Sequence, residues 1–154
     1  MRLKDRVIMI TGAAQGLGEG IARRLAAEGG TVVVADRNGE LATSVANSLA
    51  ESGHRALAVT MDVAERAQVQ AAIRKTVDAF GRLDVMFNNA GLNKPVPFME
   101  VDESNFNNIM RVNAWAVMLC TQEAARQMMA QGKGGKIINT ASIAGRQGYA
   151  EFAP

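Results

Sequence analysis

A glycine-rich turn near the N-terminus has the composition of a phosphate-binding loop. The turn reads Thr11, Gly12, Ala13, Ala14, Gln15, Gly16, Leu17 and Gly18. It joins an apolar run to a stretch with helical spacing, so bare backbone can approach a diphosphate while the helix N-terminus attracts its charge. The spacing is G-x-x-x-G-x-G and differs from the dinucleotide fingerprint G-x-G-x-x-G. A turn that only permits tight packing of helix against strand is the alternative interpretation.

Asp36 stands about 20 residues beyond the glycines, where a carboxylate accepts hydrogen bonds from the hydroxyls of an adenosine ribose. This position favours NAD, because a 2′-phosphate against Asp36 would bring like charges together. The neighbouring Arg37 could instead turn its guanidinium toward such a phosphate. The alternative is that Asp36 is simply the first residue of a turn that runs to Gly39, since aspartate is common at that position. Starting this turn and binding a ribose are compatible roles.

Two further motifs could contact the same ligand. Asp62 and Val63 follow another apolar run, and the carboxylate could accept a hydrogen bond from the exocyclic amine of adenine. Capping of the next helix is the alternative for Asp62. Farther along, two amides are followed by two small residues that would admit the centre of a dinucleotide, in the order Asn88, Asn89, Ala90 and Gly91.

Each of these motifs follows an apolar run that predicts a buried strand. The predicted strands lie at 7–10, 31–35, 56–61, 83–87 and 136–140. Helical spacing or composition connects them over 17–26, 41–49, 69–80 and 103–131. Alternation of this kind predicts an α/β fold with a doubly wound parallel sheet of the Rossmann type, and ligands bind such sheets beyond the carboxyl ends of the strands.

Taken together, the glycine turn, the two strand-terminal aspartates and the Asn-Asn-Ala-Gly segment resemble the short-chain dehydrogenase/reductase family from Arg6 onward. The resemblance implies that the glycine turn follows the diphosphate, through Gly12, Gln15, Gly16, Leu17 and Gly18. It implies that Asn89, Ala90 and Gly91 line the nicotinamide ribose. NAD is the expected cofactor, and 1–154 is expected to form one dinucleotide-binding domain.

The resemblance also implies catalytic roles for two polar residues. Ser142 matches the family serine, whose hydroxyl would hydrogen-bond the reacting oxygen. Asn113 matches the family asparagine, which would hold an ordered water in a proton relay. The alternatives are that Ser142 only caps a turn and that Asn113 only satisfies neighbouring backbone.

The remaining catalytic pair of the family, Tyr-x-x-x-Lys, would begin about thirteen residues after Ser142, with the lysine one helical turn later. That place lies directly beyond Pro154. Tyr149 does not fit the pattern, because Ala153 stands four residues after it. We therefore expect 1–154 to be the N-terminal portion of a longer one-domain enzyme that continues with further strands, and to be inactive alone.

Composition excludes several other classes of protein. The net charge of +2 is spread over scattered residues, which argues against a nucleic-acid surface. A single cysteine, Cys120, can build neither a disulfide framework nor a cysteine-based metal site, and no metal is expected. No apolar run approaches the length of a membrane span, so we expect a cytoplasmic protein.

The sequence therefore predicts an NAD-dependent oxidoreductase that interconverts a secondary alcohol and a ketone. The segment 134–145 is similar to acetoin, butanediol and sugar-alcohol dehydrogenases, so a small polyol or hydroxyketone is the expected substrate. The long helix from Glu103 resembles the one through which relatives form dimers and tetramers, and a homo-oligomer is expected for the complete enzyme. The alternatives are a non-catalytic NAD-binding module, an inactive fragment, or an S-adenosylmethionine methyltransferase, which fits 88–91 and Ser142 poorly.

Overall fold

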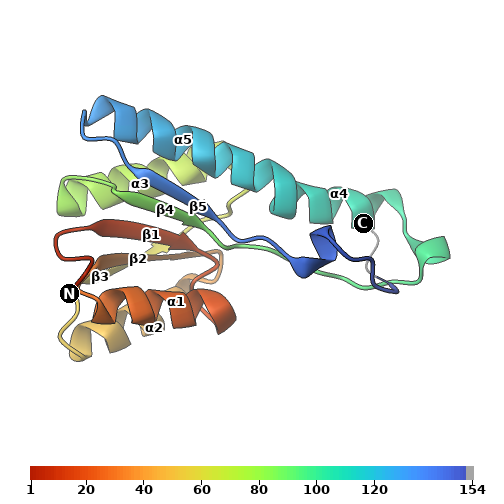
Figure 1. Cartoon of the computed structure of the whole chain (residues 1–154), viewed down its shortest axis with the longest axis horizontal. Helices are drawn as coiled ribbons and strands as arrows, with labels where there is room; N and C mark the ends of the chain where they lie inside the picture. The colour runs from red at the N-terminus through yellow and green to blue at the C-terminus, as the bar shows by residue number, and fades with distance from the viewer. Residues whose placement is uncertain (152–154) are drawn as a thin grey trace.

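A computed structural model describes residues 1–151, and the three residues that precede the expected tyrosine, 152–154, lie outside the described part. The described chain forms one parallel sheet in the order β3-β2-β1-β4-β5 with helices on both faces (Figure 1). The strands are β1 Val7–Thr11, β2 Thr31–Asp36, β3 Ala56–Thr60, β4 Val85–Asn88 and β5 Lys136–Asn139. The predicted doubly wound sheet is confirmed.

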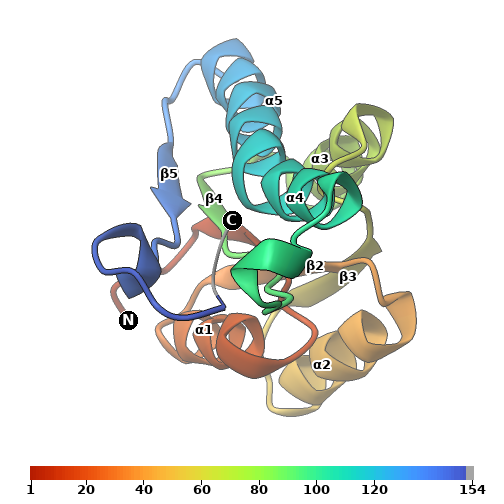
Figure 2. The same ribbon diagram turned by 90° about the vertical axis from the view of Figure 1, so that its right-hand side faces the viewer.

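The connecting helices divide between the two faces of the sheet. They are α1 Gly16–Ala27, α2 Gly39–Glu51, α3 Arg66–Phe80, α4 Glu103–Met110 and α5 Ala116–Ala130. Helices α1 and α2 cover one face, while α3 and the long α4–α5 unit cover the other (Figure 2). Short 3₁₀ helices lie at Phe98–Glu100 and Ile143–Gly145.

Alternation along the strands builds two cores. In β1, Val7 and Met9 pack with the residues of α3 and α5, whereas Ile8 and Ile10 pack with those of α1 and α2. This period of two is the pleat of a strand buried on both faces. The central strands are therefore fixed from both sides, and their carboxyl ends emerge together at one edge of the sheet.

Two sequence predictions need correction. The fourth strand was expected at 83–87, but β4 begins at Val85. Leu83 lies outside the ladder because its backbone N–H and C=O groups bond to the side-chain amide of Gln131 instead of to a strand. Gln131 Oε1 accepts from Leu83 N at 3.2 Å, and Gln131 Nε2 donates to Leu83 O at 2.7 Å. The buried Leu83 therefore belongs to the core without belonging to the strand.

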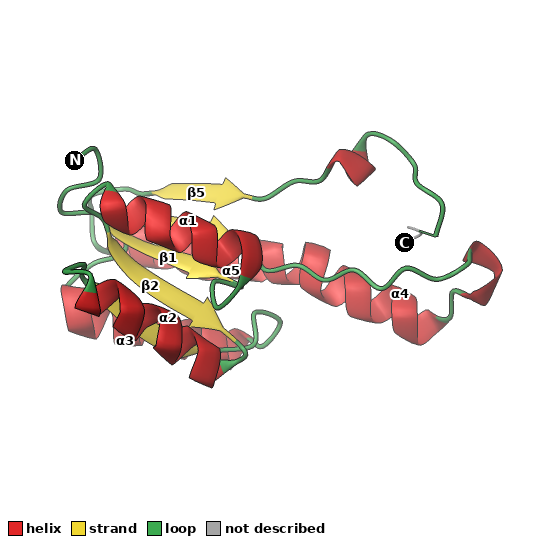
Figure 3. Cartoon of the chain, turned by 90° about the horizontal axis from the view of Figure 1, so that it is seen from below, coloured by secondary structure: helices red, strands yellow, loops and turns green. Residues whose placement is uncertain are grey.

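The second correction concerns the helix expected over 103–131. Its two ends are right to within a residue, but a π-helical turn at Arg111–Trp115 separates α4 from α5. Such turns insert an extra residue and often occur at functional sites. The combined helix extends past the end of the sheet, as Figure 3 shows. Asn113 of the π turn hydrogen-bonds to Leu92, which lies four residues beyond the end of β4.

Over residues 1–151, no helix combines the length and apolar character needed to traverse a membrane. In the same stretch, no three or more His, Cys, Asp and Glu side chains are grouped as a metal site would require.

Candidate dinucleotide site

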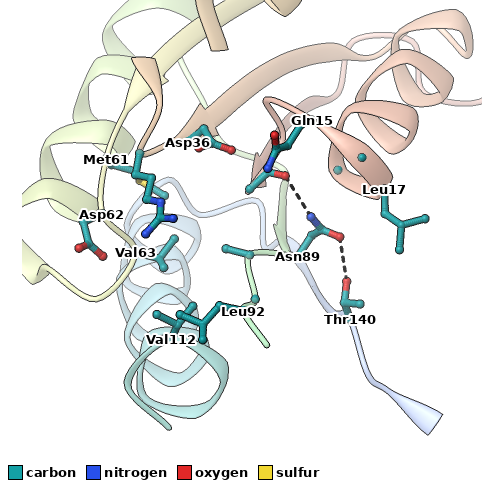
Figure 4. Close-up of a pocket in the computed structure, with 16 residues that line it drawn as sticks. Gln15, Leu17, Asp36, Met61, Asp62, Val63, Asn89, Leu92, Val112 and Thr140 are labelled. Atoms are coloured by element: carbon teal, nitrogen blue, oxygen red, sulfur yellow. Dashed lines mark hydrogen bonds between the residues drawn. The ribbon is translucent and has the colours of Figure 1, made fainter. Parts of the chain in front are cut away.

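A cavity of about 420 Å³ lies at the carboxyl ends of the strands, within the usual size range of small-molecule sites (Figure 4). All twelve residues predicted to bind the cofactor line it: Gly12, Gln15, Gly16, Leu17, Gly18, Asp36, Arg37, Asp62, Val63, Asn89, Ala90 and Gly91. They come from the ends of β1, β2, β3 and β4, so the sheet order brings together four segments that are far apart in the sequence.

The glycine turn holds its shape through close backbone approach. Gly12 has φ +64°, and a Cβ there would lie 2.9 Å from the Cα of Ala90. At Gly18 a Cβ would lie 2.1 Å from Gly12 O, which is closer than real side chains come. Both positions therefore require glycine, because a side chain would separate the turn from α1 and from the 88–91 segment.

Helices α1 and α3 begin without a side-chain cap, whereas α2 and α4 each have one. Asn38 caps α2 by accepting from Leu41 N at 3.1 Å, and Asp102 caps α4 by accepting from Asn105 N. At α1 the cap residue is Gln15, whose side chain makes no capping bond in the described structure. The first N–H groups of α1 thus remain for an anion, which fits a diphosphate in this cavity.

Asp36 stabilises the turn that follows β2 and also lines the cavity. Its Oδ1 accepts from Asn38 N at 3.0 Å, and its Oδ2 accepts from Ala14 N at 3.1 Å. Each carboxylate oxygen has a second acceptor position, so these bonds leave room for ribose hydroxyls. The contact with Ala14 also ties the carboxylate to the glycine turn, so Asp36 is held rigidly at the place where a ribose would lie.

Asp62 caps a local turn, since its Oδ1 accepts from Ala64 N at 2.8 Å. Helix α3 begins only at Arg66, with Glu65 as its cap residue, so Asp62 does not cap the helix as the alternative proposed. Asp62 and Val63 line the cavity beside Asp36 and Arg37. The adenine role stays a prediction that this placement supports.

The Asn-Asn-Ala-Gly segment is held by β1 and β5. The buried hydroxyl of Thr11 accepts from Asn89 N and Ala90 N, each at 3.0 Å. In the other direction, Asn89 Nδ2 donates to Thr11 O at 3.0 Å and to Gly12 O at 3.3 Å. Asn88 points away from the cavity and donates to Asn139 Oδ1 at 2.8 Å, linking β4 to β5. The segment is therefore rigid before any ligand binds.

The two predicted catalytic residues do not line the cavity, although Asn113 follows the lining residue Val112 and Ser142 stands two residues after the lining residue Thr140. Ser142 Oγ accepts from Ala144 N at 3.2 Å, and Asn113 makes paired bonds to one residue, accepting from Leu92 N at 2.9 Å and donating to Leu92 O at 2.8 Å. These are the turn and backbone contacts that the alternative interpretations expected. Asn113 belongs to the π turn, whose Val112 does line the cavity.

Four lining residues were missed from the sequence: Met61, Leu92, Val112 and Thr140. Met61 and Thr140 end predicted strands, so the strand-end rule could have found them. Leu92 and Val112 carried no such signal, because an apolar residue in a loop or helix does not reveal which side it faces.

Comparison with known proteins agrees with this geometry. The family model for short chain dehydrogenases matches residues 6–154. The chain belongs to the short-chain dehydrogenase family. Proteins of this family use nicotinamide cofactors. The cavity described above contains an uncapped helix N-terminus and the carboxylate of Asp36.

Two relatives illustrate the chemistry of similar short-chain dehydrogenases. A diacetyl reductase [(S)-acetoin forming] of Staphylococcus epidermidis (strain ATCC 12228 / FDA PCI 1200) is 38% identical over 145 residues, which cover 94% of this chain and 56% of the relative. A sorbitol dehydrogenase of Cereibacter sphaeroides is 37% identical over 150 residues, covering 97% of this chain and 57% of the relative. The chain thus spans a little over half the length of the relatives it matches.

The fold comparison gives the same family. A crystal structure of a short-chain type dehydrogenase/reductase from Mycobacterium marinum superposes with a TM-score of 0.92 at 33% sequence identity. The match covers 96% of this chain and 60% of that protein.

Proposed function

We propose that this chain binds NAD(H) and forms the cofactor-binding part of an oxidoreductase that acts on a secondary alcohol or ketone. The observation that carries the proposal is the convergence of four strand ends on one cavity that contains an uncapped helix N-terminus and a ribose-facing carboxylate. When bound, the nicotinamide would supply hydride transfer to or from a carbinol carbon. The residues of this chain would orient it.

The preference for NAD over NADP rests on Asp36. Its carboxylate is held between Ala14 N and Asn38 N, so it cannot swing away from an added phosphate. A 2′-phosphate beside a fixed carboxylate is unfavourable because like charges repel at short range. Arg37 lines the same end of the cavity and is exposed, so it could reduce this penalty without removing it.

The substrate class we propose is a small polyol or hydroxyketone. The similarity to a diacetyl reductase and to a sorbitol dehydrogenase supports it. In this proposal the Ser142 hydroxyl donates to the reacting oxygen, since its Oγ already uses one acceptor position on Ala144 N. Asn113 would act by holding Leu92 and the wall of the cavity in place.

Two experiments test the proposal. The first titrates the protein with NADH and with S-adenosylmethionine, following NADH fluorescence and calorimetric heat. Saturable binding of NADH alone is expected, and binding of S-adenosylmethionine alone would refute the proposal.

The second experiment reads the encoding DNA past the codon for Pro154 and assays the encoded protein with diols and sugar alcohols. Continuation into Tyr-x-x-x-Lys with NADH formation supports the enzyme, whereas NADH binding without turnover supports a non-catalytic NAD-binding module.

A further inference from the structure

A second groove lies between helices α3 and α5, which pack side by side (Figure 2). Its volume of about 370 Å³ is in the range of small-molecule sites. The lining residues recur at helical spacing along one side of each helix: Gln70, Ile73 and Arg74 of α3, and Glu123, Arg126, Gln127 and Ala130 of α5. None of them lines the dinucleotide cavity, so the groove is separate from the proposed cofactor site.

Glu123 forms a buried wall of this groove, and its carboxylate already has three donors. The side chain is only 6% exposed. Oε1 accepts from Nη1 of Arg66 and from Nη1 of Arg126, and Oε2 accepts from Gln70 Nε2 at 3.1 Å. Two guanidinium groups therefore share one carboxylate oxygen, and a single negative charge cannot balance both.

The groove as a whole carries an excess of positive charge. Arg74 lines it as well and forms no ion pair or side-chain hydrogen bond within residues 1–151. Asp78 stands one turn beyond Arg74 on α3, but the two are not paired. Three guanidinium groups thus accompany the one carboxylate of Glu123, which leaves a net charge of +2 at the groove. A concentration of charge in a concave site attracts an anion of the opposite charge.

The donors of two arginines remain available to such an anion. Arg126 uses Nη1 on Glu123, and its Nε and Nη2 have no partner within the described chain. These two nitrogens form one edge of the planar guanidinium, and such an edge binds two oxygens of a phosphate in parallel. Arg74 offers all five of its N–H donors from the facing helix.

The remaining lining residues suit the rest of a small phosphorylated molecule. Ile73 and Ala130 add apolar surface, and the Gln127 amide, which bonds to no other side chain within residues 1–151, can bond a hydroxyl. We propose that the groove binds a phosphate dianion, either free or as the monoester of a small molecule, through Arg74 and Arg126. This site does not depend on the proposed function, because the dinucleotide cavity shares no residue with it.

The test is an NMR titration of the ¹⁵N-labelled chain with inorganic phosphate and, separately, with glycerol phosphate at constant ionic strength. Amide signals of α3 and α5 report the groove, and those of the glycine turn report the dinucleotide cavity. Arg74→Gln should weaken phosphate binding at the groove at least about tenfold, the size of one hydrogen bond to a charged group. Lys133→Gln is the matched control, because Lys133 is an exposed cation three residues after Ala130 that does not line the groove. It should change the affinity by no more than about twofold.

Both phosphate sources have a defined outcome. Tighter binding of glycerol phosphate than of phosphate supports an ester as the ligand, and equal or weaker binding supports free phosphate.

Three results would overturn the inference. They are phosphate-dependent shifts confined to the glycine turn, equal losses of groove affinity in Arg74→Gln and Lys133→Gln, or the same α3 and α5 shifts with chloride at equal ionic strength. Circular dichroism shows whether each variant keeps its fold, which is expected because Arg74 contributes no side-chain bond within the described residues.

Discussion

Replacing Gly18 by alanine should weaken both the fold and dinucleotide binding, whereas the same change at Gly20 should do neither. The two glycines lie two residues apart in the first turns of α1. A Cβ at Gly18 would lie 2.1 Å from Gly12 O and 2.7 Å from Asn89 Nδ2, while a Cβ at Gly20 would meet nothing within 4 Å. Gly20→Ala is therefore a matched control in the same helix.

The size of the effect follows from these distances. Real Cβ atoms essentially never come closer than 3.0 Å, so the glycine turn or α1 must move by nearly an ångström. Overpacking of this kind costs about 1–3 kcal/mol. The gain of alanine over glycine in a helix is common to both variants and cancels in the comparison. The difference corresponds to a melting temperature about 3–9 °C lower for Gly18→Ala than for Gly20→Ala.

Binding should suffer more than stability. The displaced turn would misplace the N–H groups that face the diphosphate, and hydrogen bonds to charged groups contribute about 1.5–3 kcal/mol each. Loss of one such bond weakens NADH binding by about 10- to 100-fold. Thermal unfolding by circular dichroism and titration by NADH fluorescence measure the two effects. Equal melting temperatures for the two variants, together with equal NADH affinity, would refute this account of the turn.

Four further predictions concern other residues. Asp36→Ala should shift the ratio of NADPH to NADH affinity toward NADPH by at least about tenfold, and an unchanged ratio would remove Asp36 from the ribose site. In the active enzyme, Ser142→Ala should lower kcat by at least about 100-fold with little change in NADH affinity, and equal losses in both would contradict its catalytic role. Burial raises the pKa of Asp84, but the hydrogen bond from Val7 N and the ion pairs with arginine outweigh burial and lower it overall. A lowered pKa stabilises the folded state above the unfolded pKa, so the free energy of unfolding should fall as the pH drops below about 5, and Asp84→Asn should flatten that dependence in acid titrations followed by urea unfolding. Burial, with a smaller contribution from Glu123, raises the pKa of Cys120 to about 12, so a thiol reagent at pH 8 should label the urea-unfolded protein and leave the native protein unlabelled.

The motifs of the site could be predicted from the sequence because each one depends on local chemistry. A glycine turn between strand and helix, and an aspartate after the next strand, are readable from residue types and spacing alone. All twelve predicted cofactor residues do line one cavity. They lie together because parallel strands bring their carboxyl ends to one edge, so residues that share a place in the β-α pattern share a place in space. Their role in cofactor binding stays a prediction.

The helix interruption could not be predicted in this way. The 103–131 segment has helical composition throughout, and nothing local marks Arg111–Trp115 as a π turn. The turn sets Val112 against the cavity and Asn113 against the backbone of Leu92, which lies 21 residues earlier. The same applies to Leu83, whose apolar character predicted a strand residue while the Gln131 amide removed it from the ladder.

The sequence by itself determined the strand and helix order, the glycine turn before α1 and the aspartate that ends β2, because these depend on contacts between near neighbours. Only the tertiary structure decided that Asn89 turns its oxygen toward Thr140, and that Asp36 is held by the glycine turn as well as by its own loop. These features depend on the strand order β2-β1-β4-β5, which brings the two partners together across gaps of 51 and 22 residues. Side-chain orientation over such separations is fixed by packing, and residue type alone does not reveal it.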